Sequence, residues 1–247
     1  MTAGLAKLTK VESKIFLRDP ASVFFGLAFP SLLLIVLGSI PAFRQPNQDL
    51  GGQRTIDVYL PIVVAMAIGI LALSALPTYL ASYREKGVLR RLATTPVQPS
   101  GLLAAQLAVN LLMAVGEILL LFVIGTVAFH TPLPRNVIAF VLAFLLSAAA
   151  MLGIGLIIAA LAPSSRAAGM IGSLVYFPML FFAGMWLPRD LMPAVLRRIS
   201  DYTPLGSGVQ SLQDAANGHW PHLLALAVLA GYVAVTGLVA ARTFRWE

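Results

Sequence analysis

Cysteine is absent from this chain of 247 residues, and charged residues are scarce. Without cysteine the protein can form no disulfide, no thiolate metal site and no cysteine nucleophile, and its redox compartment stays unassigned. Charged residues supply only 11% of the chain, whereas about a quarter is typical of soluble domains. Hydrophobic residues supply 59%, and the mean hydropathy is +0.87. A chain so poor in charge is expected to have lipid as its main solvent.

The sequence also lacks any Gly-Lys-Ser/Thr element, so it has no P-loop for nucleotide phosphates. Its three histidines, His130, His219 and His222, lie near predicted membrane boundaries. His219 and His222 could share a helix face, but no carboxylate or thiolate is obviously placed to complete a metal site with them. We interpret the histidines as interfacial residues, and we predict no catalytic residues, no metal site and no cofactor on this chain.

Long apolar runs dominate what is present. A membrane-spanning helix needs about 20 predominantly apolar residues. Six runs meet this length, at residues 20–43, 59–83, 102–129, 137–161, 167–187 and 221–241. The pattern predicts an all-α polytopic membrane protein with six transmembrane helices, forming a single domain over residues 1–247.

Proline and glycine add detail inside these runs. Pro178 lies within the fifth run, and we expect a local kink there because proline leaves a backbone carbonyl without its helical partner. Small residues allow helices to approach closely in membranes. We therefore interpret four glycines as packing positions: Gly153, Gly155, Gly169 and Gly172.

Residues 1–18 read as a basic amphipathic helix that lies on the membrane surface. The apolar residues that recur at near-helical spacing are Leu5, Leu8, Val11 and Ile15, and the lysines that occupy other faces are Lys7, Lys10 and Lys14. The simpler alternative is the ordinary positively charged flank of the first span. Both alternatives are open at this point.

The longest connection, residues 188–218, separates the fifth and sixth runs. Leu191, Val195 and Ile199 recur there every four residues. This spacing predicts one or two short amphipathic helices that dip into the outer leaflet. A solvated loop is the alternative.

The distribution of charge predicts the orientation. With both termini on one side, that side holds eleven of the seventeen basic residues against four acidic ones, a net charge of +7. The other side holds six basic and five acidic residues, a net charge of +1. Cytoplasmic loops carry the excess of Lys and Arg. We therefore predict cytoplasmic termini in a plasma (inner) membrane, and we attribute the basic excess to topology and not to nucleic-acid binding.

Glu117 is the most informative single residue, because an ionisable group inside a span is costly and must face protein or water. Gln106 and Asn110 lie on the same helical face as Glu117, and the three form one polar stripe. The stripe is expected to point into the bundle or across a subunit interface. It could line the substrate pathway or carry protons, or it could join helices through hydrogen bonds.

An aromatic group marks the fifth run, where Tyr176, Phe181 and Phe182 lie close to Pro178. Aromatic rings beside a kink could form a pocket for a flat hydrophobic substrate. Packing together with an interfacial aromatic belt is the alternative.

Two segments resemble a known family. Residues 84–96 read REKGVLRRLATTP, and residues 182–188 read FAGMWLP, followed by Pro193 and by Thr203-Pro204-Leu205. Anchoring by positive charge explains the basic residues of the first segment but does not require this ordered string. Both segments resemble the corresponding stretches of ABC-2 type permeases, the daunorubicin-resistance-like exporters. Together with six spans and the N-terminal helix, the resemblance covers essentially the whole chain.

The resemblance implies a division of labour. Two permease subunits, identical or different, would each dock on an ABC ATPase subunit that binds ATP and Mg. Residues 84–101 would form the cytoplasmic coupling loop. Six positions of the loop would carry the contact with the ATPase: Arg84, Glu85, Lys86, Gly87, Arg90 and Arg91.

The expected substrate is a hydrophobic or amphipathic compound such as a drug, an antibiotic or a lipid, in keeping with the short outer loops and the apolar interior. Relatives that export polysaccharide or glycolipid keep that substrate class open. The rival hypothesis is a transporter driven by an ion gradient, in which Glu117 would carry the proton.

Overall fold

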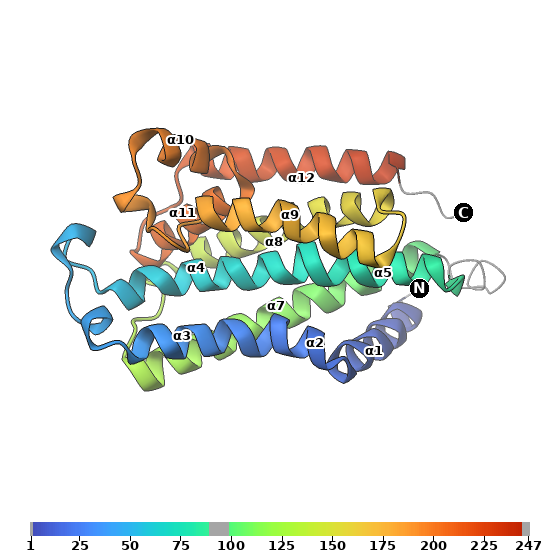
Figure 1. Cartoon of the computed structure of the whole chain (residues 1–247), viewed down its shortest axis with the longest axis horizontal. Helices are drawn as coiled ribbons and strands as arrows, with labels where there is room; N and C mark the ends of the chain where they lie inside the picture. The colour runs from blue at the N-terminus through green and yellow to red at the C-terminus, as the bar shows by residue number, and fades with distance from the viewer. Residues whose placement is uncertain (1, 89–98, 244–247) are drawn as a thin grey trace.

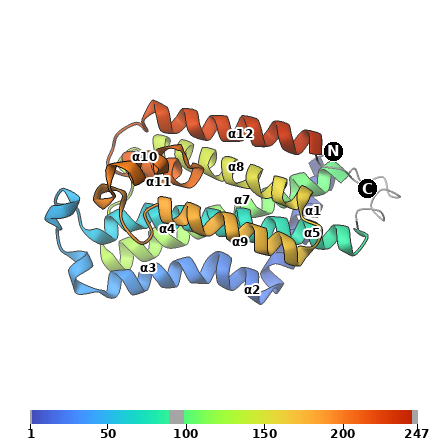
Figure 2. The same cartoon turned by 45° about the horizontal axis from the view of Figure 1, so that its top comes forward.

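The computed structural model describes residues 2–88 and 99–243, and within them nearly all regular structure is helical. Six helices are long and apolar enough to cross a membrane, which confirms the predicted number of spans. The helices run side by side along the long axis of the molecule, and both termini lie at the same end (Figures 1 and 2). This end is called the termini end below, and the other is called the far end.

The first two spans each contain one π-helical turn. The first joins α2 (Pro20–Val23), the π-helix η1 (Phe24–Ala28) and α3 (Phe29–Ser39). The second joins α4 (Thr55–Ile70), the π-helix η4 (Leu71–Ala75) and α5 (Leu76–Glu85). Two short 3-10 helices, η2 (Pro41–Arg44) and η3 (Gln48–Leu50), connect the spans at the far end.

The other four spans are single helices: α7 (Pro99–Phe129), α8 (Val137–Leu161), α9 (Ser165–Phe182) and α12 (Leu223–Thr243). Asn136 and Ser164 cap the starts of α8 and α9, because their side chains accept hydrogen bonds from Ala139 N–H and Ala167 N–H. Helix α9 continues through Pro178 to Phe182.

The second span forms the centre of the bundle. In its most apolar stretch 94% of the residues are buried inside the protein, whereas the corresponding share in the other five spans is 22–50%. In Figure 1 it passes between α8 and α9 on one side and α3 and α7 on the other. A helix that is apolar on all faces is expected in such a central position.

Two glycines let α8 and α9 approach the π-helical turn η4. A methyl group on Gly155 would overlap the carbonyl oxygen of Ala72, and one on Gly172 would overlap that of Leu73. A methyl group on Gly153 would likewise overlap Thr236 of α12. The predicted packing role is confirmed for these glycines. At Gly169 a methyl group would lie 3.6 Å from Thr78 Oγ1, an ordinary contact distance, so that position does not require glycine.

The connection between the fifth and sixth spans contains η5 (Arg189–Leu191), α10 (Ala194–Tyr202) and α11 (Pro204–Ala216). Helix α10 exposes Val195 and Ile199 and fits the predicted short amphipathic helix. Helix α11 is different, because it is buried against α8, α4 and α12 and not on a surface. Its small residues allow this packing, as Gly208 faces Ser147 of α8 with no room for a larger side chain.

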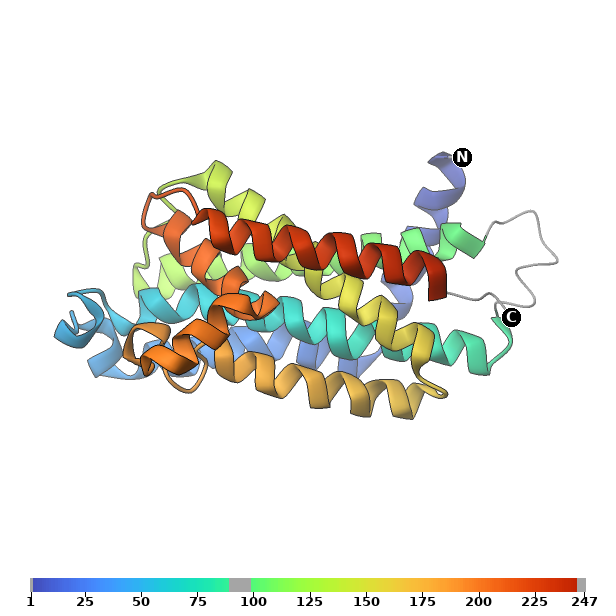
Figure 3. The same ribbon diagram turned by 90° about the horizontal axis from the view of Figure 1, so that it is seen from above.

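Helix α1 (Thr2–Arg18) crosses the long axis of the bundle at the termini end (Figure 3). Glu12 and Phe16 form its buried side. Val11 and Ile15, which belong to the predicted apolar stripe, are exposed. Val11 and Ile15 are therefore free to contact lipid, and the location of α1 on a membrane surface stays a prediction.

Candidate functional site

Arg84 joins the end of the second span to the end of the fourth. It lies in the last turn of α5, and its guanidinium donates hydrogen bonds to the carbonyls of Ala160, at 3.3 Å, and Ala162. Helix α8 ends at Leu161, so the carbonyl of Ala160 belongs to its final turn and that of Ala162 to the residue that caps it. The last carbonyls of a helix lack partners within the helix and carry partial negative charge, which a cation stabilises.

Glu85 makes the complementary contact with the next helix. Its carboxylate accepts a hydrogen bond of 2.8 Å from the hydroxyl of Ser165, the first residue of α9. A carboxylate is favourable at a helix N-terminus, where backbone N–H groups are unpaired. Arg84 and Glu85 therefore bind, respectively, the end of α8 and the start of α9, on both sides of the turn that joins them.

The chain turns directly after this pair. Gly87 has a left-handed φ of +64°, and its N–H donates to the carbonyl of Arg84. A left-handed residue that closes a helix is commonly glycine. Lys86 is exposed at the turn. Arg90 and Arg91, the other residues predicted to contact the ATPase, lie outside the described residues.

A buried carboxylate connects α1 to the spans. Glu12 accepts hydrogen bonds from the hydroxyl of Tyr83, at 2.6 Å, and from the side-chain amide of Gln106, at 2.7 Å. Burial raises the pKa of Glu12, and the hydrogen bond from Tyr83 opposes the rise. Since Tyr83 is one residue before Arg84, α1 contacts the segment that enters the predicted coupling loop.

A second carboxylate reinforces this contact one helical turn away on α5. Asp19 caps α2 and accepts hydrogen bonds from the hydroxyls of Ser22, at 2.6 Å, and Tyr79, at 2.9 Å. The hydrogen bond from Ser22 is the main reason that the pKa of Asp19 is lowered. Asp19 and Glu12 together hold the start of the chain against α5.

The polar stripe of the third span lies inside the described chain. Gln106, Asn110 and Glu117 are all buried. The amide of Asn110 donates to the carbonyl of Gln106, and the hydroxyl of Ser31 in α3 donates to Glu117 Oε1 at 3.0 Å. Within the described residues, Asn110 Oδ1 and Glu117 Oε2 have no hydrogen-bond partner. The stripe thus joins α7 to α1 and α3 and keeps two unused acceptors.

The aromatic group of the fifth span is divided between two environments. Tyr176 is buried and donates a hydrogen bond of 3.1 Å to the carbonyl of Met66 in the second span. Phe181 packs edge-on against Phe182, with ring centroids 5.4 Å apart. A groove of about 750 Å³ runs beside them along α9, but its lining includes none of these three residues. Their role in substrate binding stays a prediction.

Arg189 organises the far end and gives the second recognised segment a physical basis. It is buried and donates hydrogen bonds to the hydroxyl of Ser200, the carbonyl of Gly206 and the carboxylate of Asp201. The hydroxyl of Ser200 in turn donates to the carbonyl of Phe182 at 2.6 Å. The sequence analysis did not identify Arg189 as a functional residue. Its position directly after the FAGMWLP string could have indicated its importance.

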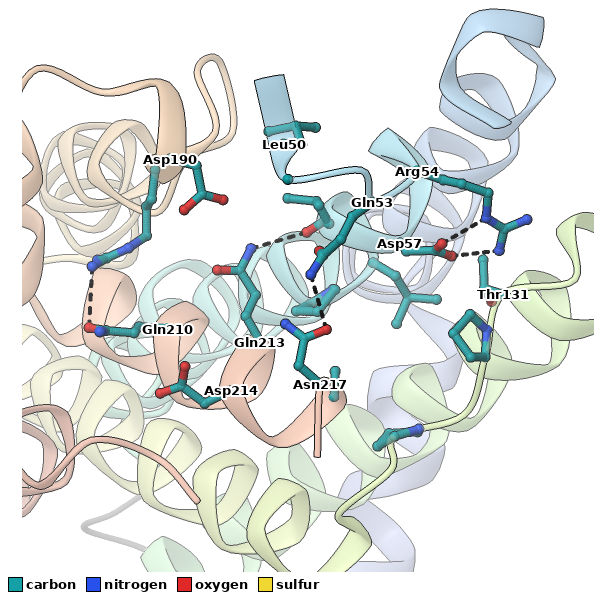
Figure 4. A pocket seen from close by; sticks show the side chains of 18 of the residues that line it. Leu50, Gln53, Arg54, Asp57, Thr131, Asp190, Gln210, Gln213, Asp214 and Asn217 are labelled. Atoms are coloured by element: carbon teal, nitrogen blue, oxygen red, sulfur yellow. Dashed lines mark hydrogen bonds and ion pairs between the residues drawn. The ribbon is translucent and has the colours of Figure 1, made fainter. Parts of the chain in front are cut away.

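A cavity of about 890 Å³ opens next to Arg189 (Figure 4). The Arg54–Asp57 ion pair, at 2.7 Å, lies on one side of it, and Asp190 and Gln210 lie on the other. Residues from η3, α4, α11 and the connections between the helices form most of the rim, and amide and charged side chains are frequent among them. Leu60, Phe122 and Phe140 line the part that lies between the spans. The cavity therefore combines a polar rim with an apolar inner wall.

His222 has a carboxylate partner that the sequence did not suggest. Its Nδ1 lies 2.8 Å from Asp214 Oδ2. Asp214 lies in α11, whose burial brings it to the start of the sixth span. Among the described residues no group of three or more His, Cys, Asp or Glu side chains is arranged to hold a metal ion.

Comparison with known proteins agrees with this architecture. The family model of the ABC-2 type transporter matches residues 5–216, which is most of the chain. The chain belongs to the ABC-2 type transporter family. It is 24% identical over 226 residues to a Bacillus subtilis (strain 168) protein described as "Putative transport permease YvfS", and the match covers 90% of each chain. The protein is thus a multi-pass membrane permease of a transport system.

Proposed function

We propose that this chain is the membrane-spanning subunit of an ATP-driven exporter that moves a hydrophobic or amphipathic compound out of the cell. It pairs with a second permease subunit, identical or different, in the plasma membrane, and both termini are cytoplasmic. ATP and Mg bind to a separate ATPase subunit that contacts residues 84–101. Membership of the ABC-2 type transporter family supports such a partner in general terms.

The contact of Arg84 and Glu85 with α8 and α9 carries the proposal. A displacement of the loop that begins at Arg84 acts directly on the ends of two other spans, because charged hydrogen bonds connect them. Tyr83 extends the connection to α1 through Glu12. Force applied at this loop therefore reaches four helices without passing through the apolar core.

The cavity at the far end supports an amphipathic substrate. Its polar rim and apolar inner wall offer separate surfaces to the polar and apolar parts of one molecule. Ligand sites generally combine an apolar lining with a few polar groups that fix orientation. Export of a polysaccharide or a glycolipid uses the same polar rim and is the alternative within this architecture.

Reconstitution tests the proposal. The chain is co-expressed with candidate ATPases, purified and placed in lipid vesicles, and ATP hydrolysis is measured with a panel of amphipathic compounds. We expect a compound that stimulates hydrolysis to be transported only when ATP and Mg are present on the ATPase side. Transport in vesicles that contain no ATPase subunit contradicts the proposal.

An ion-gradient transporter is the second candidate, and Glu117 favours it. Its Oε2 is buried without a hydrogen-bond partner among the described residues, so it could accept a proton. This candidate predicts transport that continues without ATP and stops when a protonophore is added. The exporter predicts transport that stops without ATP and continues when a protonophore is added.

A further inference from the structure

A groove follows the line where α1 crosses α7. It has a volume of about 600 Å³ and is lined on one side by α1 residues between Ala6 and Leu17, and on the other by Leu112 of α7. The crossing itself is visible in Figure 3, where α1 lies across the bundle. Because α1 and α7 diverge from their crossing point, the side chains of neither helix fill the angle between them. The groove therefore stays open to the outside of the protein.

Among the described residues that line the groove, two lysines provide the only charged side chains. Lys10 and Lys14 are four residues apart and therefore lie next to each other on one face of α1. Both are exposed, and within the described chain neither forms an ion pair. Glu12 and Phe16 lie on the opposite face of α1, which is buried against the bundle. The groove thus presents two uncompensated positive charges.

The apolar end of the groove reaches the depth of the lipid chains. Gln106 contacts Glu12, which fixes where α1 crosses α7. Leu112 lies six residues further along α7, which is about 9 Å towards the far end at 1.5 Å per residue. Val115 and Leu119 continue this exposed apolar surface along the same helix. A molecule in the groove can therefore touch the lysines and the hydrocarbon region at the same time.

We propose that this groove binds an anionic phospholipid from the leaflet at the termini end. The phosphate lies between the ammonium groups of Lys10 and Lys14, and one acyl chain follows Leu17 and Leu112. Basic pockets beside spanning helices bind acidic head groups in this way. A zwitterionic lipid is disfavoured, because its own cation would approach the same lysines. The proposal depends neither on the exported substrate nor on the ATPase.

Native mass spectrometry of the full chain tests this site. The protein is purified in a mild detergent and titrated with phosphatidylglycerol or with phosphatidylcholine of the same acyl chains. We expect one phosphatidylglycerol to bind more tightly than phosphatidylcholine, and we expect each of Lys10→Gln and Lys14→Gln to weaken it about fivefold. Leu112→Trp fills the apolar part and is expected to reduce binding without changing the charge.

Matched variants separate a site from diffuse attraction. Lys7→Gln removes the same charge from the same helix but does not touch the groove lining, so phosphatidylglycerol binding should persist. Lys10→Arg and Lys14→Arg keep the charge and should restore binding if the chain is otherwise intact. Equal binding of the two lipids overturns the proposal. So does an equal loss of binding in the Lys7 and Lys10 variants, or unchanged binding in the Leu112 variant.

Discussion

The hydroxyl of Tyr83 donates a hydrogen bond of 2.6 Å to the carboxylate of Glu12, which is 71 residues away in the sequence. The side-chain amide of Gln106 donates to the same oxygen. One buried carboxylate thus joins the N-terminal helix to the second and third spans. Because Tyr83 precedes Arg84, this junction lies next to the contacts that we propose transmit the ATPase stroke.

Glu12→Ala is the first test of this junction. The change leaves the Tyr83 hydroxyl and the Gln106 amide without an acceptor, and it should cost about 1–3 kcal/mol. Glu12→Gln keeps an oxygen that can accept both hydrogen bonds, and it should be at least as stable as the native chain at pH 7. Thermal unfolding in detergent and hydrogen exchange of residues 2–18 measure the two variants. Equal loss in both would contradict the hydrogen-bond assignment.

Glu12 contributes to the dependence of stability on pH through its pKa. Burial raises this pKa above its ordinary value of 4.5, so the folded state favours the protonated form. The contribution of Glu12 to stability is therefore fully present below pH 4.5 and is lost as the pH rises through the folded pKa. In Glu12→Gln this loss should disappear. Asp49→Asn, which alters an exposed carboxylate at the far end, is the control and should keep the native profile.

Arg84→Ala should separate ATP hydrolysis from transport. The change leaves the carbonyls of Ala160 and Ala162 without their donor and removes the cation from the end of α8. We expect the free energy of unfolding to fall by about 1–3 kcal/mol. We also expect transport to fall more than ATP hydrolysis, so that less substrate is moved per ATP hydrolysed. Arg84→Lys keeps the charge but cannot reach both carbonyls with one planar fork, so its effect should be intermediate.

The control for Arg84 is Arg242→Ala. Arg242 is an exposed arginine of α12 at the same end of the bundle, and in the described chain it forms no ion pair. This variant should keep the native ratio of transport to hydrolysis. If both arginine variants lower the ratio equally, the effect is one of overall charge and the coupling assignment is wrong.

Prediction from sequence succeeded where one local property decides the structure. Each span follows from the length and apolarity of its own residues, and all six were predicted. Helix α11 shows the limit. Ser207 and Ser211 are small and polar, which resembles a surface segment, yet they are buried because α11 packs closely against α8 and α4. Burial of that kind depends on partners that are distant in sequence.

In the candidate site, too, local features were predicted from the sequence and contacts between distant residues were not. The polar stripe of Gln106, Asn110 and Glu117 was predicted from helical spacing, and the three residues are buried as a group. Their partners, Glu12 and Ser31, belong to other helices, and no spacing rule connects them. Arg84 was recognised through its family string, but its contact with α8 depends on residues 76 and 78 positions away.

Gly155→Ala and Gly172→Ala test the close contact between three spans. Each added methyl group would overlap a carbonyl oxygen of the π-helical turn η4, so α8 or α9 must move away. Overpacking of this kind typically costs about 1–3 kcal/mol. Gly231→Ala and Gly237→Ala in α12 are the controls, since open space surrounds both positions. They should be neutral or slightly stabilising, because alanine favours helix. Thermal unfolding of the four variants measures the difference.

Glu117→Gln decides between the two proposed energy sources. The amide keeps an oxygen for the Ser31 hydroxyl, which now donates to Glu117 Oε1 at 3.0 Å, but it cannot carry a proton. If ATP drives transport, the variant should retain most of the ATP-dependent activity in vesicles. If a proton gradient drives it, transport should fall to background while the protein stays folded. Glu117→Leu is the companion variant, because it removes the acceptor. It should lower stability by about 1–3 kcal/mol under either mechanism, since it leaves a buried hydroxyl unpaired.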